Sequence, residues 1–201
     1  ELADSELACA LSHREIYLTI LEEKLAGAIV LEDDVVISPE FACFVRAGLH
    51  RTDSILLLDY RFGRALPWQK KSMGRWTLYR AAQTATLASS YSVSHLTASR
   101  LLEVTSPVSY VADWPVDLHS IGAHLIVPKL ASQGNLPEHA SLISPGRSKL
   151  QTKAGKPFLR YFRKSYYRGL LRRKFARALG TKNHKYTKFC LLMIIHRSSA
   201  E

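Results

Sequence analysis

The sequence predicts an α/β fold with a mainly parallel sheet flanked by helices, and three observations carry this prediction. Residues 28–31 and 55–58 are uninterrupted apolar runs of strand length, which is typical of strands buried on both faces. Segments with helical apolar spacing precede and separate these runs, over residues 2–25 and 38–49. The order helix, strand, helix, strand favours parallel strands joined by helices.

The first two helices have recognisable ends. Asp4 or Ser5 is a suitable N-cap for the first helix, and Gly27 ends its apolar pattern. The second helix is expected to start with Ser38 as N-cap and Pro39 at its first helical position. Each of these helices is followed along the chain by one of the two buried strands.

The middle of the chain gives weaker signals. Residues 61–75 contain glycine, proline and basic residues, so we expect a loop there. The remaining expectations are an edge strand at 76–80, a strand at 90–94, a helix at 96–104, a turn leading into a short helix at 112–119, a strand at 124–127, and a loop and linker at 132–157.

The charge of the chain is concentrated at its C-terminal end. The net charge is +11, yet residues 147–201 hold sixteen Lys and Arg and a single acid, Glu201, so the rest is mildly acidic. We therefore divide the chain into a body, residues 1–146, and a basic tail, residues 147–201. Residues 158–179 of the tail predict a helix with an aromatic and leucine stripe beside Lys and Arg. Such basic segments bind polyanions, meaning nucleic acid, anionic lipid or acidic glycan.

The three cysteines exclude two protein classes. They are widely spaced, odd in number and form no CxxC, which argues against a disulfide scaffold and a zinc site and fits a reducing compartment. No apolar run reaches the roughly 18 residues of a membrane span. The longest late run, residues 189–195, is compatible with a strand, a frayed end or an interfacial segment.

Three consecutive carboxylates, Glu32, Asp33 and Asp34, follow the first buried run. Ligands of α/β proteins bind at the carboxyl ends of strands, and adjacent carboxylates repel one another unless a cation holds them. Oxygen ligands of this kind suit Mg²⁺ and Mn²⁺. The alternative is a solvated turn after a core strand.

Several motifs, in order, resemble glycosyltransferase family 25, the bacterial lipooligosaccharide galactosyltransferases and their collagen-modifying relatives. The motifs are Ala8-Cys9-Ala10-Leu11-Ser12-His13, then Ile29-Val30-Leu31-Glu32-Asp33-Asp34-Val35, Thr84-Ala85-Thr86 with Ser90-Tyr91-Ser92-Val93-Ser94, Pro115-Val116-Asp117, and Pro128-Lys129-Leu130-Ala131-Ser132-Gln133. The resemblance covers about residues 1–147. It implies a GT-A fold whose opening strand and helix, part of the nucleotide pocket, would lie before Glu1.

The resemblance implies transfer of a sugar, usually galactose, from a UDP-sugar to a lipid-linked lipooligosaccharide or LPS core glycan, with inversion and with Mn²⁺ or Mg²⁺ as cofactor. On extended chain Glu32 and Asp34 point the same way, so we assign them to the metal and diphosphate. Asp33 would face a ribose hydroxyl or a structural partner, and an early turn would exchange the roles of Asp33 and Asp34. Ser12 and His13 match the family's Ser-His, either as donor contacts or as a buried polar pair.

The reaction also needs a base for the acceptor hydroxyl. Asp117 matches the family's Pro-(Val/Ile)-Asp element and is the first choice, with a plain helix N-cap as the alternative role. Asp113 is the second choice. Asp59 ends the second buried strand, where an ordinary turn is the favoured role, and Tyr60 and Trp114 are either sugar-stacking or core aromatics.

The basic tail fits an interfacial helix on anionic lipid, or a solvated helix packed on the body. With a lipid-linked acceptor, the first role implies a peripheral enzyme on the cytoplasmic face of the bacterial inner membrane. Two other function classes compete with a membrane-associated transferase. One is a nucleic-acid-binding protein acting through the tail, and the body has no recognition motif for it. The other is a truncated, inactive fragment of a transferase.

Overall fold

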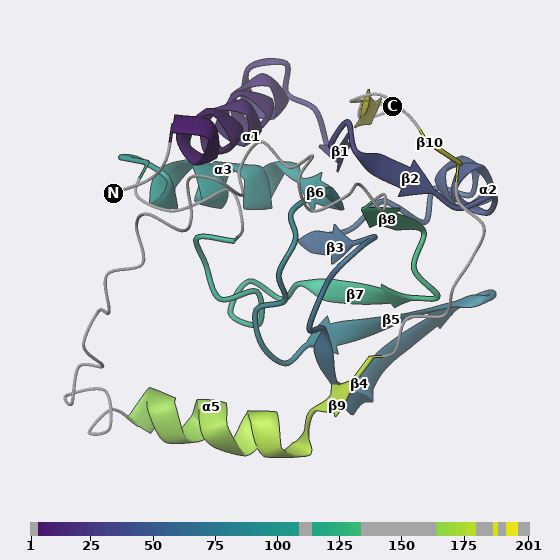
Figure 1. The fold of residues 1–201 in the computed structure, drawn as a ribbon, viewed down its shortest axis with the longest axis vertical. Helices are drawn as coiled ribbons and strands as arrows, with labels where there is room; N and C mark the ends of the chain where they lie inside the picture. The colour runs from purple at the N-terminus through teal and green to yellow at the C-terminus, as the bar shows by residue number, and fades with distance from the viewer. Residues whose placement is uncertain (1–3, 109–113, 134–163, 180–186, 189–191, 197–201) are drawn as a thin grey trace.

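The computed structural model describes residues 4–108, 114–133, 164–179, 187–188 and 192–196 (Figure 1). Its helices are α1 (Asp4–Glu22), α2 (Phe41–Arg46), α3 (His95–Val104) and α5 (Lys164–Phe175). Its strands are β1 (Gly27–Leu31), β2 (Val35–Ile37), β3 (Ile55–Leu57), β4 (Arg64–Met73), β5 (Trp76–Ala81), β6 (Ser90–Ser94), β7 (His124–Val127), β8 (Ala131–Gln133), β9 (Arg177–Ala178), β10 (Thr187–Lys188) and β11 (Leu192–His196). The predicted α/β class is confirmed.

The large sheet is mostly antiparallel, so the prediction of a mainly parallel sheet is wrong. Its order is β11-β1-β6-β3-β7-β5-β4-β9, and β3 with β7 is its parallel pair among the described strands. The reason lies in β6, which is antiparallel to both β1 and β3 and lies between them. The segment through α2 makes β3 run parallel to β1, as a helical crossover does. The two strands are nevertheless not neighbours in the sheet.

The β1 strand is buried on both faces, as its uninterrupted apolar run predicts. Ala28 and Val30 belong to a core formed with α1 and α3, which pack against each other on one side of the sheet (Figure 1). Ile29 and Leu31 belong to the core formed with α2. Successive residues of a strand point to opposite faces, so one strand contributes to two cores.

A small second sheet follows the acidic turn. Its order is β10-β2-β8, with both pairs antiparallel. It places Val35 opposite Gln133, so the residue after the carboxylates lies beside the end of β8. The loop predicted at 132–157 therefore begins inside a strand, and residues 134–157 lie outside the described part of the chain.

Two predictions for the middle of the chain are wrong. Residues 64–73, expected to be a loop, form β4, the longest strand. Its lysines and Pro67 are acceptable there because, along most of its length, β4 has one strand neighbour. As a result β5 is not an edge strand, since β4 and β7 flank it.

Two helix starts also differ from prediction. The α2 helix begins at Phe41, its N-cap residue is Glu40, and no side chain caps it. Residues 118–122 form a turn rather than a short helix, closed by the bond that the Ser120 amide donates to the Asp117 carbonyl at 2.8 Å. The predicted helices over α1 and α3 are confirmed within their bounds.

The basic tail contributes α5, β9, β10 and β11 to the described structure. The α5 helix lies at the β4–β9 end of the sheet, away from α1 and α3, which lie near β1 and β6 (Figure 1). It ends at Phe175, and the part of the predicted helix before Lys164 is outside the described residues. The late apolar run contains β11, which pairs with β1 from Gly27 to Leu31. No helix in the described ranges is long and apolar enough to cross a membrane.

Candidate functional site

The three carboxylates lie in a turn at the end of β1, and they do not share one direction. The strand ends at Leu31, residues 33 and 34 are a turn, and the Val35 amide donates to the Glu32 carbonyl at 3.2 Å. An extended chain would have placed Glu32 and Asp34 side by side. In the turn Glu32 contacts α1, Asp34 contacts β8, and Asp33 is exposed between them.

Glu32 is held by a buried hydrogen-bond network. Nε2 of His13 lies 3.1 Å from Oε1 of Glu32, and Nδ1 of the same ring lies 2.8 Å from the hydroxyl of Tyr91. The Tyr91 hydroxyl is in turn 3.0 Å from that of Tyr17. Tyr17 donating to Tyr91, Tyr91 to His13, and His13 to Glu32 gives each of these groups a hydrogen-bond partner.

The thiol of Cys9 lies on the same side, one helical turn before His13. Its sulfur is 3.8 Å from Oε1 of Glu32, and the ligand atoms of Cys9, His13 and Glu32 all lie within 4.8 Å of one another. Sulfur, imidazole and carboxylate are ligand types of zinc. The hydrogen bonds described above account for the arrangement without an ion, so the position of His13 fits the predicted buried polar role.

Asp34 is held by a second network, from β8. Nε2 of Gln133 donates to Oδ2 of Asp34 at 2.8 Å, while the backbone amide of Gln133 donates to Oδ2 of Asp59 at 2.9 Å. Asp59 also forms an ion pair with Lys129, at 3.0 Å, and both side chains are buried. Asp59 is therefore a fully paired residue that fixes the end of β8, which agrees with its predicted structural role.

The second oxygen of Asp34 is left without a partner. Oδ1 is buried and accepts no hydrogen bond. Burial raises the pKa of Asp34, the Gln133 bond opposes this, and the negative charges of Glu32 and Asp33 raise the pKa further. A buried, unpaired carboxylate oxygen beside two more carboxylates is the electrostatic environment that a cation relieves.

These residues fit a divalent cation of the Mg²⁺ or Mn²⁺ kind. Oδ1 of Asp34 is available as a ligand, and Glu32 has a second oxygen besides the one bonded to His13. Gln133 and His13 would orient these two carboxylates from behind, as the outer contacts of metal ligands commonly do.

Asp117 lies at a separate polar cavity of about 570 Å³. The cavity is lined by Gln83, Thr84, Trp114, Val116, Asp117, Arg172 and Arg173. Oδ2 of Asp117 lies 3.2 Å from a guanidinium nitrogen of Arg172, and Oδ1 accepts the His119 amide at 3.1 Å. Asp117 thus caps a turn instead of the predicted helix.

The remaining predicted residues have clear outcomes. Ser12 is exposed and its hydroxyl donates to the Ala8 carbonyl of its own helix at 3.0 Å, so it does not form a pair with His13. Asp113 lies outside the described residues. Tyr60 is a core residue whose hydroxyl donates to the Ile126 carbonyl at 3.0 Å.

Trp114 connects the two carboxylate sites. Its ring packs edge-on against Tyr91 with 5.1 Å between centroids, and it lines the Asp117 cavity. Tyr91 in turn bonds His13, the partner of Glu32. A continuous set of buried side chains therefore runs from the end of β1 to the cavity of Asp117.

Sequence reasoning assigned no site role to Gln133, Arg172 or Thr84. Gln133 and Thr84 belong to motifs that carried the family resemblance, so order along the chain was a usable signal for them. Arg172 had none, because one arginine in a segment rich in Lys and Arg cannot be singled out from spacing.

Comparison with known proteins gives one match. The sequence model described as glycosyltransferase family 25 (LPS biosynthesis protein) matches residues 1–118, which include α1, the carboxylates after β1, and Asp117. No curated protein and no solved structure matches the chain. The matched region covers more than half of the sequence and contains the carboxylates of both sites, and we conclude that the chain belongs to glycosyltransferase family 25.

Proposed function

We propose that the protein transfers a hexose, most simply galactose, from a UDP-sugar to a hydroxyl of a lipooligosaccharide or LPS core glycan, with inversion. The family supports glycosyl transfer in LPS biosynthesis with a nucleotide-sugar donor. The single observation that carries the rest is the unpartnered, buried oxygen of Asp34 beside Glu32 and Asp33. It is the feature that suits a donor diphosphate with its cation. Carboxylates after a buried strand also agree with the proposed GT-A fold.

In this proposal the chain's own residues divide the work between two sites. Asp34 and Glu32 hold Mn²⁺ or Mg²⁺ at the donor diphosphate, and Asp33, which is exposed, faces the donor ribose. A bound divalent cation neutralises the charge of the departing diphosphate. Asp117 accepts the proton of the acceptor hydroxyl. The acceptor oxygen then bonds to the anomeric carbon, and the bond from that carbon to the diphosphate oxygen breaks with its electron pair leaving on UDP.

The test is UDP release from UDP-galactose, with Mn²⁺ and a truncated lipooligosaccharide acceptor. Loss of a general base lowers the rate by about 10²–10⁴-fold, so Asp117→Ala should fall in that range. Asp34→Ala should also lose activity and should no longer respond to Mn²⁺. Asp53→Ala is the matched control, since Asp53 is an exposed aspartate outside both sites. A wild-type protein without turnover sinks the proposal, and full activity in Asp117→Ala removes that residue as the base.

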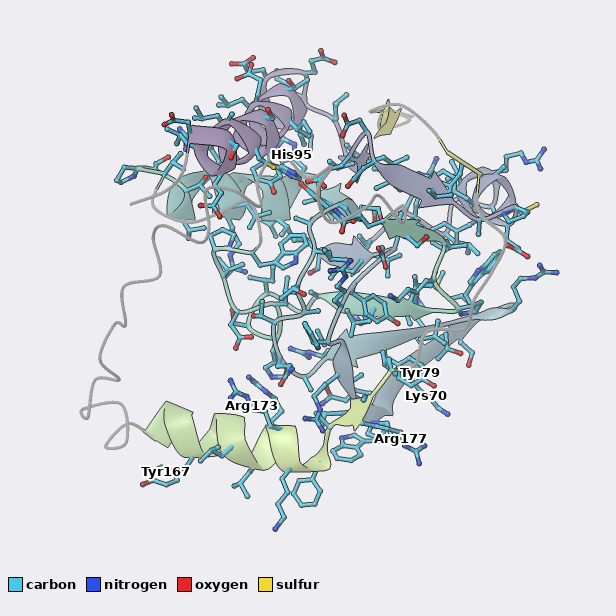
Figure 2. All side chains as sticks on the ribbon, in the orientation of Figure 1. Lys70, Tyr79, His95, Tyr167, Arg173 and Arg177 are labelled. Carbon is cyan, nitrogen blue, oxygen red and sulfur yellow. The ribbon has the colours of Figure 1, made fainter. Side chains whose placement is uncertain are left out.

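We also propose that α5 binds an anionic membrane surface, where a lipid-linked acceptor would be found. The large apolar side chains of α5 whose burial is described are exposed. Together with Trp68 of β4 they form the outer apolar face: Trp68, Tyr167, Leu170, Leu171 and Phe175. In Figure 2, Tyr167 points away from the body and Arg173 points toward it. The helix contains five Lys and Arg and no acid, which suits anionic lipid.

A further inference from the structure

The cavity of Asp117 combines one carboxylate with two guanidinium groups. Arg172 and Arg173 reach it from α5, and the other lining residues include no acid besides Asp117. In Figure 2, the Arg173 side chain extends from α5 toward the body of the protein. A polar cavity whose lining carries a net positive charge is suited to an anionic ligand.

The two arginines are not neutralised to the same degree. Arg172 is paired with Asp117 at 3.2 Å, and its Nε is buried without any partner. Arg173 lines the cavity and forms no ion pair with the described residues. A guanidinium has five N–H donors in a planar fork that matches the oxygens of phosphate or carboxylate, so most of this donor capacity is available to a ligand.

The pairing of Arg172 with Asp117 also bears on catalysis. The Asp117 side chain is 46% exposed; its Oδ2 is bonded to Arg172, and its Oδ1 accepts the His119 amide. An acceptor hydroxyl that gives its proton to Asp117 would have to reach Oδ2. The ion pair therefore occupies the position that the reaction requires.

We propose that this cavity is a subsite for an acceptor sugar that carries a phosphate or carboxylate group, bound by Arg172 and Arg173. The anion competes with Asp117 for Arg172, so its binding frees Oδ2 for the acceptor hydroxyl. This inference rests on the proposed function, because it assigns Asp117 as the base. It adds a substrate class, an acidic acceptor, and makes Arg172 a positioning residue that couples acceptor binding to release of the base.

Two molecules are candidate sources of the anionic group in this cavity: the acceptor sugar, with its own phosphate or carboxylate, and the donor, with its diphosphate. Calorimetric titrations of the full chain with galactose 6-phosphate, methyl galactoside and UDP distinguish them without requiring turnover. Galactose 6-phosphate should bind at least tenfold more tightly than the neutral methyl galactoside. UDP, with Mn²⁺ present, should bind without displacing galactose 6-phosphate.

Arg172→Gln and Arg173→Gln should each weaken the binding of galactose 6-phosphate by at least tenfold and leave UDP affinity unchanged. Arg177→Gln is the matched control, since Arg177 is an exposed arginine of β9 outside the cavity. Arg172→Lys keeps the charge and loses the fork, so its affinity should lie between those of wild type and Arg172→Gln. Thermal melting of each variant checks that it is folded.

The positioning role has its own readout. Arg172→Gln should lower the rate with a neutral acceptor less than with an anionic one, and its loss with the anionic acceptor should appear mainly in KM. Equal binding of anionic and neutral sugars overturns the anion subsite. A second outcome is that UDP displaces galactose 6-phosphate from the wild type, and that Arg172→Gln and Arg173→Gln both abolish this competition. That outcome overturns the acceptor assignment. Because binding is measured without turnover, an inactive protein that still binds galactose 6-phosphate would refute the proposed function and not the subsite.

Discussion

Gln133 supports the carboxylate site through two hydrogen bonds, one from its side chain and one from its backbone. Its amide side chain donates to Asp34 at 2.8 Å, and its backbone amide donates to Asp59 at 2.9 Å. Lys129 pairs with Asp59 behind it. The position of the carboxylate proposed as a metal ligand is thus fixed by residues that contact no ligand themselves.

Gln133→Ala should weaken Mn²⁺ binding by about 10–100-fold, the usual effect of removing an outer contact of a metal ligand. The residue lies near the end of β8, so the fold should survive the change. Mn²⁺ titration followed by electron paramagnetic resonance measures the affinity directly. Gln69→Ala, on β4, is the control. Unchanged Mn²⁺ affinity in Gln133→Ala would show that Asp34 does not depend on this contact, or does not bind the ion.

Tyr17 predicts a loss of stability at alkaline pH. Burial raises its pKa from 10.0 to about 12, against the smaller opposite effect of the Tyr91 hydrogen bond. The unfolded chain loses the proton first, near pH 10, so native stability is complete below pH 10 and falls as the pH rises toward 12. Tyr17→Phe should make the fall shallower by about 1.4 kcal/mol per pH unit. Urea unfolding between pH 8 and pH 11.5 measures this, and equal slopes in wild type and variant contradict it.

At the residue scale, sequence reasoning singled out the candidate residues and missed their contacts. Glu32, Asp34, His13 and Asp117 were identifiable because carboxylates after a buried strand and a family motif are local patterns. The turn at residues 33 and 34, which gives Glu32 and Asp34 different partners, depends on α1 and β8. No spacing rule within the turn contains information on those distant elements.

At the scale of elements, the reliable predictions were those with a strong apolar pattern. The buried strands β1 and β3 and the helices α1 and α3 have such a pattern and were predicted at the right places. The β4 strand was missed because its basic residues and Pro67 are typical of loops, while its neighbour β5 supplies the hydrogen bonds that make it a strand. The mostly antiparallel pairing of the sheet was missed because the order of elements along the chain does not reveal that β6 lies between β1 and β3.

The β11 strand should be necessary for a stable sheet. It pairs with β1 along residues 27–31, and on the other side β1 pairs with β6. Ending the chain at residue 191 removes the backbone hydrogen bonds of this pair and leaves β1 as an exposed apolar edge. With a net value of roughly 1 kcal/mol per bond, the melting temperature should fall by about 5 °C or more, with aggregation.

The control for this truncation ends the chain at residue 196 and keeps β11. Differential scanning calorimetry and light scattering should separate the two proteins, with the longer one resembling the full chain. If both truncated proteins melt together with the full chain, the β11 pairing contributes nothing to stability in solution.

At the scale of the whole molecule, α5 both lines the Asp117 cavity and carries most of the outer apolar face. α5 lies at the β4–β9 end of the sheet, away from α1 and α3, and contributes two arginines to the Asp117 cavity (Figure 1). Its apolar residues remain exposed on its other side. A single helix would thus face the proposed acceptor subsite with one side and a membrane with the other.

This arrangement predicts binding to anionic vesicles that depends on apolar side chains as well as charge. The double variant Leu171→Ser and Phe175→Ser should reduce co-sedimentation with vesicles containing phosphatidylglycerol by about tenfold or more. Each substitution removes apolar surface that would otherwise be buried in the lipid. Leu96→Ser is the control, an exposed leucine on α3. Equal sedimentation of the double variant and the wild type would remove α5 as the membrane contact, and vesicles of neutral lipid should bind weakly in either case.

The burial of β1 on both faces has a further consequence for how this sequence can change. Ala28 and Val30 face one core, Ile29 and Leu31 the other, and Glu32 leaves the strand on the side of α1. Inserting or deleting one residue between 27 and 31 would exchange the two cores and redirect every carboxylate that follows. A single substitution in β1 leaves this alternation in place, whereas a change in length does not. Insertions are expected to be tolerated in the β4–β5 turn at Gly74, because a Cβ there would meet no atom within 4 Å.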